Sequence, residues 1–384
     1  MATRKLALLF DGTWNKPESN TNVQRLRELI ATSDTAGTPQ RVKYIAGVGV
    51  SPGITHLLGG AFGYGLSTNV LDGYRWLCET WQAGDELYLF GFSRGAYTAR
   101  SLGGMIRKCG LLKRATDGSI GASDISGAYD FYRDVSIKPD DPAGADFRAR
   151  HSIEIDIHFI GVWDTVGSLG IPDTASWFPF ARSRYQFHDT DLSKIVKYAY
   201  HALALDEHRA DFEPAVWTRN PDTMQPGETM DCKKRAQIDV EQRWFIGSHS
   251  DVGGGNDCDG AGRKPDPLPD IPLAWLQRQA IAAGLACSEI LIPVADADTG
   301  VPRNSYAEFM DGIYQHVKPP FNRRFGTGVN ETVDESVWHR WRIDAGYRSA
   351  VVLQALADSS LKMPQVAAAP ASPSGTLPMS GEDA

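Results

Sequence analysis

The sequence predicts an α/β fold, with a mostly parallel central sheet covered by helices on both faces. Short apolar runs, typical of strands buried on both sides, alternate with segments whose apolar residues recur every three or four positions. Among the 384 residues, 42% are hydrophobic and 22% are charged, which is the composition of an ordinary globular protein. A formal net charge of −8 argues against nucleic acid as a partner, because affinity for phosphates needs cations.

Strands and helices alternate from the beginning of the chain. Residues 5–10 (KLALLF) predict a buried strand that ends at Asp11, where a turn begins. An amphipathic helix follows, for which Asn22 is the expected N-cap, and residues 42–46 predict a second strand. This order begins the succession that a parallel sheet requires.

The same alternation continues through the middle of the chain. A helix over 66–81 precedes a strand over 86–90. A third helix begins after Ser93 and stops at Gly110, a residue type that favours the positive φ of helix ends. Later strands are expected over 155–162, 198–205 and 243–246.

We expect one domain over residues 1–363, with insertions around 114–150 and 178–194 that lie above the sheet. Residues 364–384 are rich in Ala, Pro and Ser and predict a disordered tail. Five cysteines without a CxxC pair favour a reducing compartment, and neither a metal nor an organic cofactor is implied. The first residues lack a signal-peptide core and no apolar stretch is long enough to span a membrane, so we expect a protein that is cytoplasmic as synthesised.

Residues 91–95 (GFSRG) satisfy the pattern GxSxG, directly after an apolar strand and directly before an amphipathic helix. In this context the pattern is typical of a sharp strand-to-helix turn that exposes a nucleophilic serine. Small residues two positions before and after Ser93 permit close approach of the backbone, and the backbone N–H of Arg94 can face a developing oxyanion. Ser93 is therefore the predicted nucleophile.

A nucleophilic serine needs a general base, and His249 is the favoured one among nine histidines. It follows a strand within WFIGSHSDVGGG, whose glycines allow the backbone to approach a site closely. His201 and His208 are its competitors. The structural alternative for His249 itself is a hydrogen bond to Asp251 within a turn.

The carboxylate that orients such a base is expected at the C-terminal end of a strand. Asp164 follows the run IDIHFIGVW and gives the chain order Ser93, Asp164, His249, which is the order of hydrolases built on this turn. Asp206, at the end of YAYHALAL, is the alternative acid, although residues 206–209 (Asp-Glu-His-Arg) could equally form a structural charge cluster.

Gly12 and Thr13, in the loop after the first strand, are the candidates for a second oxyanion donor. A strand followed by Asp-Gly-Thr is also typical of aspartyl-phosphate phosphatases. Leu9, however, occupies the position of their nucleophilic aspartate, which excludes that chemistry. Asp257 and Asp259 hint at a calcium ion, but the glutamate that completes an EF-hand loop is missing, so we expect a surface loop there.

Six segments carry a resemblance to a known family: FDGTWN, AGVGV, GDELYLFGFSRGAYTAR, FIGVWDTVGSLG, ALDEHRADFEPAVW and WFIGSHSDVGGG. Over about residues 4–280 the chain resembles an uncharacterised α/β-hydrolase domain that also forms the catalytic part of type VI secretion lipase effectors. The resemblance implies an α/β-hydrolase fold and ester hydrolysis, with Ser93 as nucleophile, Asp164 as acid and His249 as base. For the family members that are effectors, the resemblance implies phospholipase activity. Those effectors look longer than this chain.

We therefore expect a serine hydrolase that cleaves carboxylic esters, lipid esters foremost, through an acyl-enzyme intermediate. A carboxylesterase or an acyltransferase on small soluble esters stays open, as does a non-catalytic interaction module on a hydrolase scaffold. The expected partner is a small-molecule or lipid ester. Transient contact with a membrane surface and type VI export without a cleavable signal are open alternatives, and the sequence leaves the oligomeric state unknown.

Overall fold

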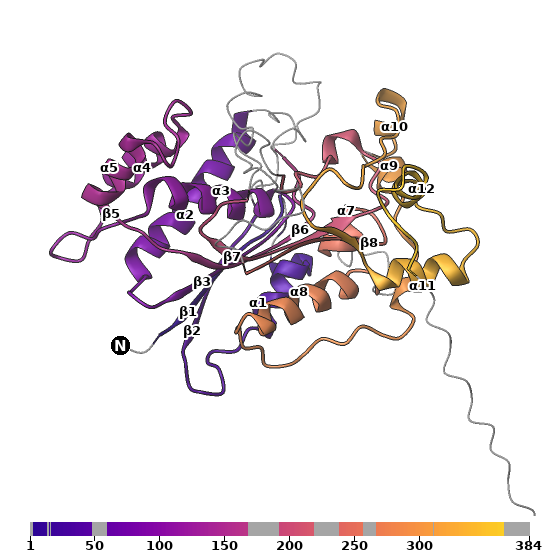
Figure 1. Cartoon of the computed structure of the whole chain (residues 1–384), viewed down its shortest axis with the longest axis horizontal. Coiled ribbons are helices and arrows are strands. Elements are labelled where there is room, and N and C mark those ends of the chain that lie inside the picture. Colours follow the sequence, from indigo (N-terminus) through magenta and orange to yellow (C-terminus); the bar gives the residue numbers. More distant parts are fainter. Residues whose placement is uncertain are drawn as a thin grey trace, which may run out of the picture.

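A parallel seven-stranded sheet lies at the centre of the computed structural model (Figure 1). The structure describes residues 3–13, 15, 17–47, 60–167, 192–218, 238–255, 266–309 and 311–364, with the backbone alone for 60–65. The strand order is β2-β1-β3-β6-β7-β8-β9, and each neighbouring pair is parallel. The strands are β1 (Lys5–Phe10), β2 (Gln40–Ile45), β3 (Glu86–Phe92), β6 (Ile157–Trp163), β7 (Val196–Ala204), β8 (Asp239–Phe245) and β9 (Glu331–Val333).

The strand β1 is apolar throughout because it lies between two layers of helices. Leu6, Leu8 and Phe10 pack into one hydrophobic cluster, whereas Ala7 and Leu9 pack into a second cluster on the opposite face. All five side chains are fully buried. Because successive residues of a strand point to opposite faces, a strand that is covered on both faces needs an apolar residue at every position.

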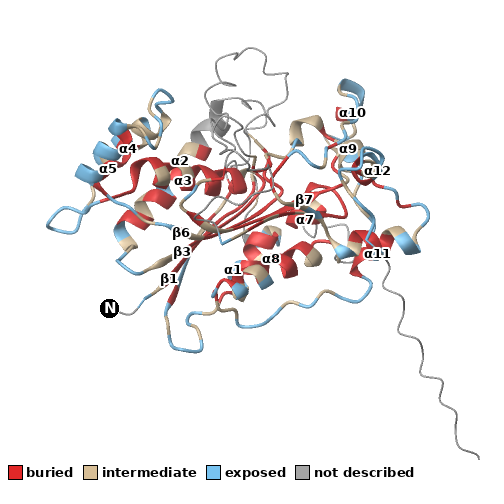
Figure 2. Cartoon of the chain, viewed as in Figure 1, coloured by how far each residue is buried: buried red, intermediate tan, exposed pale blue. Residues whose placement is uncertain are grey.

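Helices cover both faces of the sheet, and the prediction of an α/β fold is confirmed (Figure 1). The first cluster joins β1 to α2 (Gly60–Thr80) and α3 (Arg94–Cys109), and the second joins it to α1 (Asn22–Leu29) and α8 (Asp270–Ala282). The inner faces of α3 and α8 are buried against the sheet (Figure 2). The positive φ expected at the end of α3 is present at Gly110, with φ 70°.

The expected N-cap of α1 was wrong by one residue. Thr21 is the cap, and its hydroxyl oxygen accepts a hydrogen bond from the backbone N–H of Gln24 at 3.2 Å. The Asn22 side chain instead donates to the carbonyl oxygens of Val252 and Pro269, both at 2.9 Å. Asn22 therefore ties α1 to α7 and to the residue that precedes α8, long-range contacts that capping preferences do not predict.

The expected insertion around 114–150 consists of two helices beside α2 and α3. They are α4 (Ala122–Arg133) and α5 (Pro142–His151), and much of their surface is exposed (Figure 2). A short antiparallel pair, β4 (Leu111–Leu112) with β5 (Ser152–Ile153), closes the insertion at its base. Most of the other expected insertion, residues 178–191, and the expected tail from 365 onward lie outside the described residues.

Several short elements of the described residues lie in the connections between these strands and helices. They are η1 (Pro17–Ser19), η4 (Ala210–Phe212), α7 (His249–Gly253), η7 (Ala297–Thr299), α9 (Ser305–Glu308) and α10 (Tyr314–Val317). No helix in the described part of the chain is long and apolar enough to cross a membrane.

The C-terminal part of the chain extends the sheet and its core. It contributes the edge strand β9, α11 (Glu335–Ile343) and α12 (Ala350–Ala357). In a third hydrophobic cluster, Trp338 of α11 and Val351 of α12 pack with Leu203 of β7 and Trp244 of β8. The strand β9 was not expected, because its three residues are not an apolar run and none is fully buried. One domain through residue 363 stays a prediction, and this shared cluster supports it.

Replacing Trp338 with alanine tests whether the C-terminal helices fold together with the sheet. Trp338 is 5% exposed, and removing such a buried aromatic side chain costs roughly 3–5 kcal/mol in the free energy of unfolding. We expect urea denaturation to show one cooperative transition at lower urea concentration. Leu353→Ala, at an exposed position of α12, is the control and is expected to change stability by about 0.5 kcal/mol or less. An early transition confined to the C-terminal part would contradict a single domain.

Candidate active site

Ser93 lies at the tip of the turn that joins β3 to α3. Its backbone has φ 59° and ψ −123°, a positive-φ conformation that is uncommon for a residue with a side chain. A Cβ on Gly91 would lie 2.5 Å from the carbonyl oxygen of Gly95, and a Cβ on Gly95 would lie 2.1 Å from that of Phe10. Both distances are too short for any side chain, so the turn can close against β1 only with glycine at both positions.

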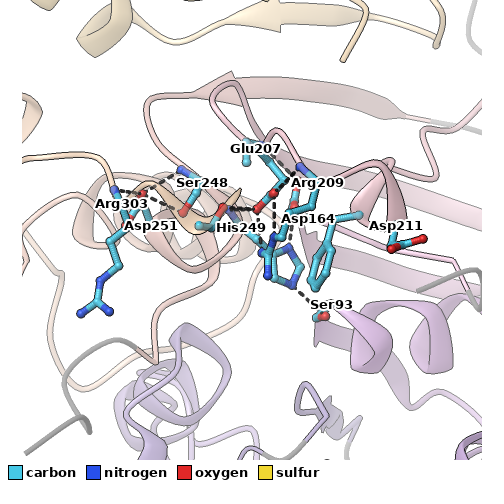
Figure 3. Close-up of polar contacts among 12 residues, drawn as sticks. Ser93, Asp164, Glu207, Arg209, Asp211, Ser248, His249, Asp251 and Arg303 are labelled. Carbon is cyan, nitrogen blue, oxygen red and sulfur yellow. Dashed lines mark hydrogen bonds and ion pairs between the residues drawn. The ribbon is translucent and has the colours of Figure 1, made fainter. Parts of the chain in front are cut away.

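His249 begins α7, in the segment that follows β8, and its ring lies between a serine and a carboxylate (Figure 3). The Nε2 atom is 2.8 Å from Ser93 Oγ, and the Nδ1 atom is 2.6 Å from Oδ2 of Asp164. The rings of Phe92 and Phe212 contact the imidazole at centroid distances of 4.6 and 5.1 Å. When Nδ1 carries the proton that it donates to the carboxylate, Nε2 is left to accept the proton of the serine hydroxyl.

Asp164 immediately follows β6, and its side chain is completely buried. Oδ1 accepts hydrogen bonds from the Ala204 backbone N–H at 3.0 Å and from Nη1 of Arg323 at 2.6 Å. Oδ2 accepts from Nη2 of Arg323 at 2.9 Å as well as from His249. Burial alone raises the pKa of this carboxyl, but the Arg323 charge and the hydrogen bonds from His249 and Arg323 outweigh it and hold the pKa well below the ordinary value.

Burial lowers the pKa of His249 below that of an ordinary histidine, and the hydrogen bond to Asp164 and its charge oppose this effect only in part. Glu207, a second carboxylate beside His249, already has a partner. Nε and Nη2 of Arg209 donate to its two oxygens at 2.8 and 2.7 Å (Figure 3). Glu207 also accepts from the backbone N–H of His249 at 3.2 Å. The imidazole is therefore neutral at neutral pH, which is the state that a general base requires.

The two competing histidines are bound to other parts of the chain. Nε2 of His201 accepts a hydrogen bond from the backbone N–H of Thr165 at 3.0 Å, and burial lowers the pKa of His201 to about 3. Nδ1 of His208 lies 3.1 Å from the carbonyl oxygen of Phe321 and donates to it. Both rings thus hold backbone segments in place, which is a structural role.

The alternative carboxylates are also occupied. Asp206 accepts from the backbone N–H of Gly247 at 2.8 Å. Asp251 accepts from the backbone N–H and the hydroxyl of Ser248, at 2.7 and 3.0 Å, in a capping box at the start of α7. Among the carboxylates of the described residues, Asp164 is the one whose side chain is hydrogen-bonded to the ring of His249.

The loop after β1 runs beside Ser93. A Cβ on Gly12 would lie 3.3 Å from Cβ of Ser93. The Gly12 backbone N–H is already used, because it donates to Oδ1 of Asp11 at 2.7 Å, and Asp11 is fixed by Thr21 and Tyr44 at 2.8 and 2.7 Å. Gly12 and Thr13 were the expected oxyanion donors of this loop. The N–H of Gly12 is directed at Asp11 within the loop instead.

The other expected oxyanion donor is the backbone N–H of Arg94, at the start of α3. Arg94 is the first residue of this helix, and the first N–H groups of a helix have no acceptor within it. Thr13, in the facing loop, has a buried hydroxyl without a hydrogen-bond partner in the described part of the chain. Thr13 belongs to the loop whose Gly12 lies beside Ser93, and Arg94 follows Ser93 directly in the chain.

Within the described ranges no group of three or more His, Cys, Asp and Glu side chains is arranged to hold a metal ion. Asp257 and Asp259, where the sequence hinted at calcium, lie outside the described residues.

Arg323 is the site residue that the sequence analysis missed. It lies in the segment NRRFG between α10 and β9, where neither apolar periodicity nor a motif distinguishes it from neighbouring arginines. The pair Glu207 and Arg209 was recognised only as part of a charge cluster. Such long-range pairs depend on the packing of loops, which local patterns do not encode.

A parallel sheet flanked by helices, with a serine on a glycine-bounded strand-to-helix turn and a buried carboxylate and imidazole behind it, defines an α/β-hydrolase fold. The chain belongs to the family "T6SS, Phospholipase effector Tle1-like, catalytic domain", whose model matches residues 4–279. This finding confirms the resemblance drawn from the motifs. It supports a hydrolase of the lipase or esterase type.

The chain is also similar to individual proteins. It is 30% identical over 244 residues to an uncharacterized protein of Saccharomyces cerevisiae, a match that covers 57% of this chain and 33% of that protein. The chain thus spans about one third of the length of this relative.

Three solved structures are similar at low identity. They are an uncharacterized protein from Pseudomonas aeruginosa (18% identity, TM-score 0.43, covering 82% of this chain and 51% of that one), a Tle1 effector bound to the VgrG spike of the type 6 secretion system (15%, 0.39, 68% and 52%), and the esterase Est2 from Thermogutta terrifontis with butyrate bound (13%, 0.36, 75% and 86%).

Substituting Gly95 with alanine tests the turn. The new methyl group would meet the carbonyl oxygens of Phe10 and Asp11, so either the turn or β1 must shift. We expect the Tm to fall by several degrees, because overpacking lowers the free energy of unfolding by about 1–3 kcal/mol. The control is Gly127→Ala in α4, where the added atom meets nothing, and where the higher helix propensity of alanine should raise stability by roughly 0.5–1 kcal/mol. Equal behaviour of the two variants would contradict the steric argument.

Proposed function

We propose that the protein is a serine hydrolase that cleaves carboxylic esters, with lipid esters as its substrates. The observation that carries the proposal is a pair of hydrogen bonds made by the ring of His249. Nδ1 lies 2.6 Å from Asp164 Oδ2, and Nε2 lies 2.8 Å from Ser93 Oγ. The three residues follow the C-terminal ends of β3, β6 and β8, which are strands of one parallel sheet. Serine, imidazole and carboxylate in this geometry are the groups that acyl transfer needs.

In the proposed mechanism, His249 Nε2 takes the proton of the Ser93 hydroxyl while Oγ bonds to the ester carbonyl carbon. The tetrahedral intermediate collapses when the carbon–oxygen bond to the alcohol breaks and His249 gives its proton to the departing oxygen. Water then attacks the acyl-enzyme with the same imidazole as base, which releases the acid and restores Ser93. Asp164 stays ionised throughout and stabilises the imidazolium that forms in each half of the reaction.

The oxyanion of each intermediate would be held by backbone N–H groups on both sides of Ser93. We assign one donor to Arg94, at the start of α3, and the second to Thr13. Gly12 is the weaker candidate in this structure, because its N–H donates to Asp11. Losing one such donor typically lowers kcat by roughly 100- to 1,000-fold.

Family membership supports a phospholipid as the ester and, with it, transient contact with a membrane surface and export by a type VI route. A carboxylesterase or an acyltransferase on soluble esters would use the same three residues. Comparing phosphatidylcholine vesicles with a p-nitrophenyl ester series of increasing acyl length separates these functions. A preference for the short soluble esters would contradict a lipase, and ester formation with an added alcohol would indicate an acyltransferase.

Replacing Ser93 with alanine removes the proposed nucleophile. We expect kcat for p-nitrophenyl esters to fall by roughly 10⁶-fold and labelling by a fluorophosphonate to disappear, with an unchanged circular dichroism spectrum. Ser101→Ala is the matched control, since this serine is also buried and lies on α3, and it should keep the label. Persistent labelling of the Ser93 variant, or a well-folded wild type that takes no label, would contradict the proposal and favour a non-catalytic module.

The pH dependence follows from the lowered pKa of His249. The base works only when neutral, so kcat/KM should be constant at neutral pH and fall as the pH drops through the pKa of His249. Because burial lowers this pKa, we expect the midpoint of the acid limb below about 6.5, the ordinary histidine value. Steady-state rates with a soluble ester between pH 4 and 9 measure it. A midpoint above that value would contradict burial as the larger effect and indicate that Asp164 outweighs it.

A further inference from the structure

Arg323 reaches the candidate site from outside the matched family region. The match ends at residue 279, whereas Arg323 lies between α10 and β9. Its segment is fixed to the loop after β7, because the Phe321 N–H donates to His208 O at 2.8 Å and Nδ1 of His208 donates back to Phe321 O at 3.1 Å. Further along the segment, the Val329 N–H donates to the carbonyl oxygen of Trp217 at 2.9 Å.

The guanidinium of Arg323 joins the acid to the surrounding backbone. Nη1 donates to Oδ1 of Asp164 at 2.6 Å and to Ala204 O at 2.9 Å, and Nη2 donates to Oδ2 of Asp164 at 2.9 Å and to Phe212 O at 2.6 Å. Both side chains of the ion pair are completely buried. A planar fork with paired donors fits a carboxylate in one orientation only, which a single ammonium group does not achieve.

Each oxygen of Asp164 has two donors, and Arg323 supplies one of the two in both cases. Without Arg323, Oδ1 would keep only the Ala204 N–H and Oδ2 only His249. A buried charge that loses its partner is strongly destabilised, and it then takes up a proton or rotates toward other donors. Either response would disturb the hydrogen bond that holds the imidazole of His249.

We propose that Arg323 is a positioning residue for the reaction: it keeps Asp164 ionised and turned toward His249, so that the segment after the matched family region completes the active site. This inference rests on the proposed function. Arg323 acts through Asp164, and its role is to fix the acid that orients the base.

The other charged groups around the two residues do not replace Arg323. Arg209 is bound through Nε and Nη2 to Glu207, so this pair presents little net charge to the imidazole. Burial first, and then the charges of Arg100 and Arg323, lower the pKa of the nearby His201 to about 3, so this imidazole stays neutral at neutral pH. Within the described residues, Arg323 is the cation that is hydrogen-bonded to Asp164.

Removing Arg323 moves the acid limb of the pH profile in one direction. If Asp164 stays ionised, the loss of the cation leaves an uncompensated negative charge beside His249, and the imidazole takes up a proton at higher pH. If Asp164 becomes protonated instead, activity requires its ionisation, which then occurs at higher pH as well. In both cases activity is lost at a pH higher than in the wild type.

The test compares Arg323→Met, Arg323→Lys and the control Arg340→Met by their kcat/KM profiles for a soluble p-nitrophenyl ester. Arg340 is also a buried arginine of the C-terminal part, but it donates to the carbonyl oxygens of Asp298 and Gly300. For Arg323→Met we expect kcat/KM to fall on the order of 100-fold and the acid limb to move to higher pH. Arg323→Lys should return the acid limb toward the wild-type position, with a rate that stays below wild type because the fork is lost.

An unchanged acid limb in folded Arg323→Met would overturn the inference, and so would an equal shift in Arg340→Met. If the methionine variant does not fold, the lysine variant decides: wild-type kcat/KM in Arg323→Lys would contradict the need for paired donors. These outcomes are distinct from failure of the proposed function, in which the wild type neither hydrolyses the ester nor takes a fluorophosphonate label.

Discussion

The carboxylate of Asp164 is the point on which the rest of the site depends. A completely buried charge is tolerated only where hydrogen bonds and an opposite charge replace the water that it has lost. The donors that replace this water come from the backbone of β7, from the start of α7 and from the segment before β9. Asp164 itself follows β6. Four stretches of chain are therefore held in register by one side chain, and the distance between His249 and Ser93 is set by that register.

Much of this arrangement could be predicted because it depends on short patterns of apolar residues and glycines in the sequence. A strand covered on both faces must be apolar throughout, as β1 is, and a turn that presses against a neighbouring strand excludes every side chain, as at Gly91 and Gly95. The parallel sheet then fixes where strand ends meet. Ser93, Asp164 and His249 follow strands, so their meeting at one edge of the sheet follows from topology combined with three short motifs.

What could not be predicted depends on contacts between distant loops. Thr21 and Asn22 are both residue types that suit a helix N-cap, but the side chain of Asn22 donates instead to the carbonyl oxygens of Val252 in α7 and of Pro269 before α8. The N–H of Gly12 is diverted by a carboxylate whose orientation depends on Tyr44 in β2. Arg323 stands in a segment with no periodicity and no motif, and its role emerges only when the loop after β7 brings it against Asp164.

The sequence distance between Asp164 and Arg323 has a consequence for the chain during its synthesis. The strands that carry the serine, the acid and the imidazole leave the ribosome well before residue 323, because domains emerge from the N-terminus onward. Until the guanidinium arrives, the nascent polypeptide carries a carboxylate that lacks its counter-charge. Under the proposed function, competence to react with an ester would thus be acquired only after residue 323 has been synthesised.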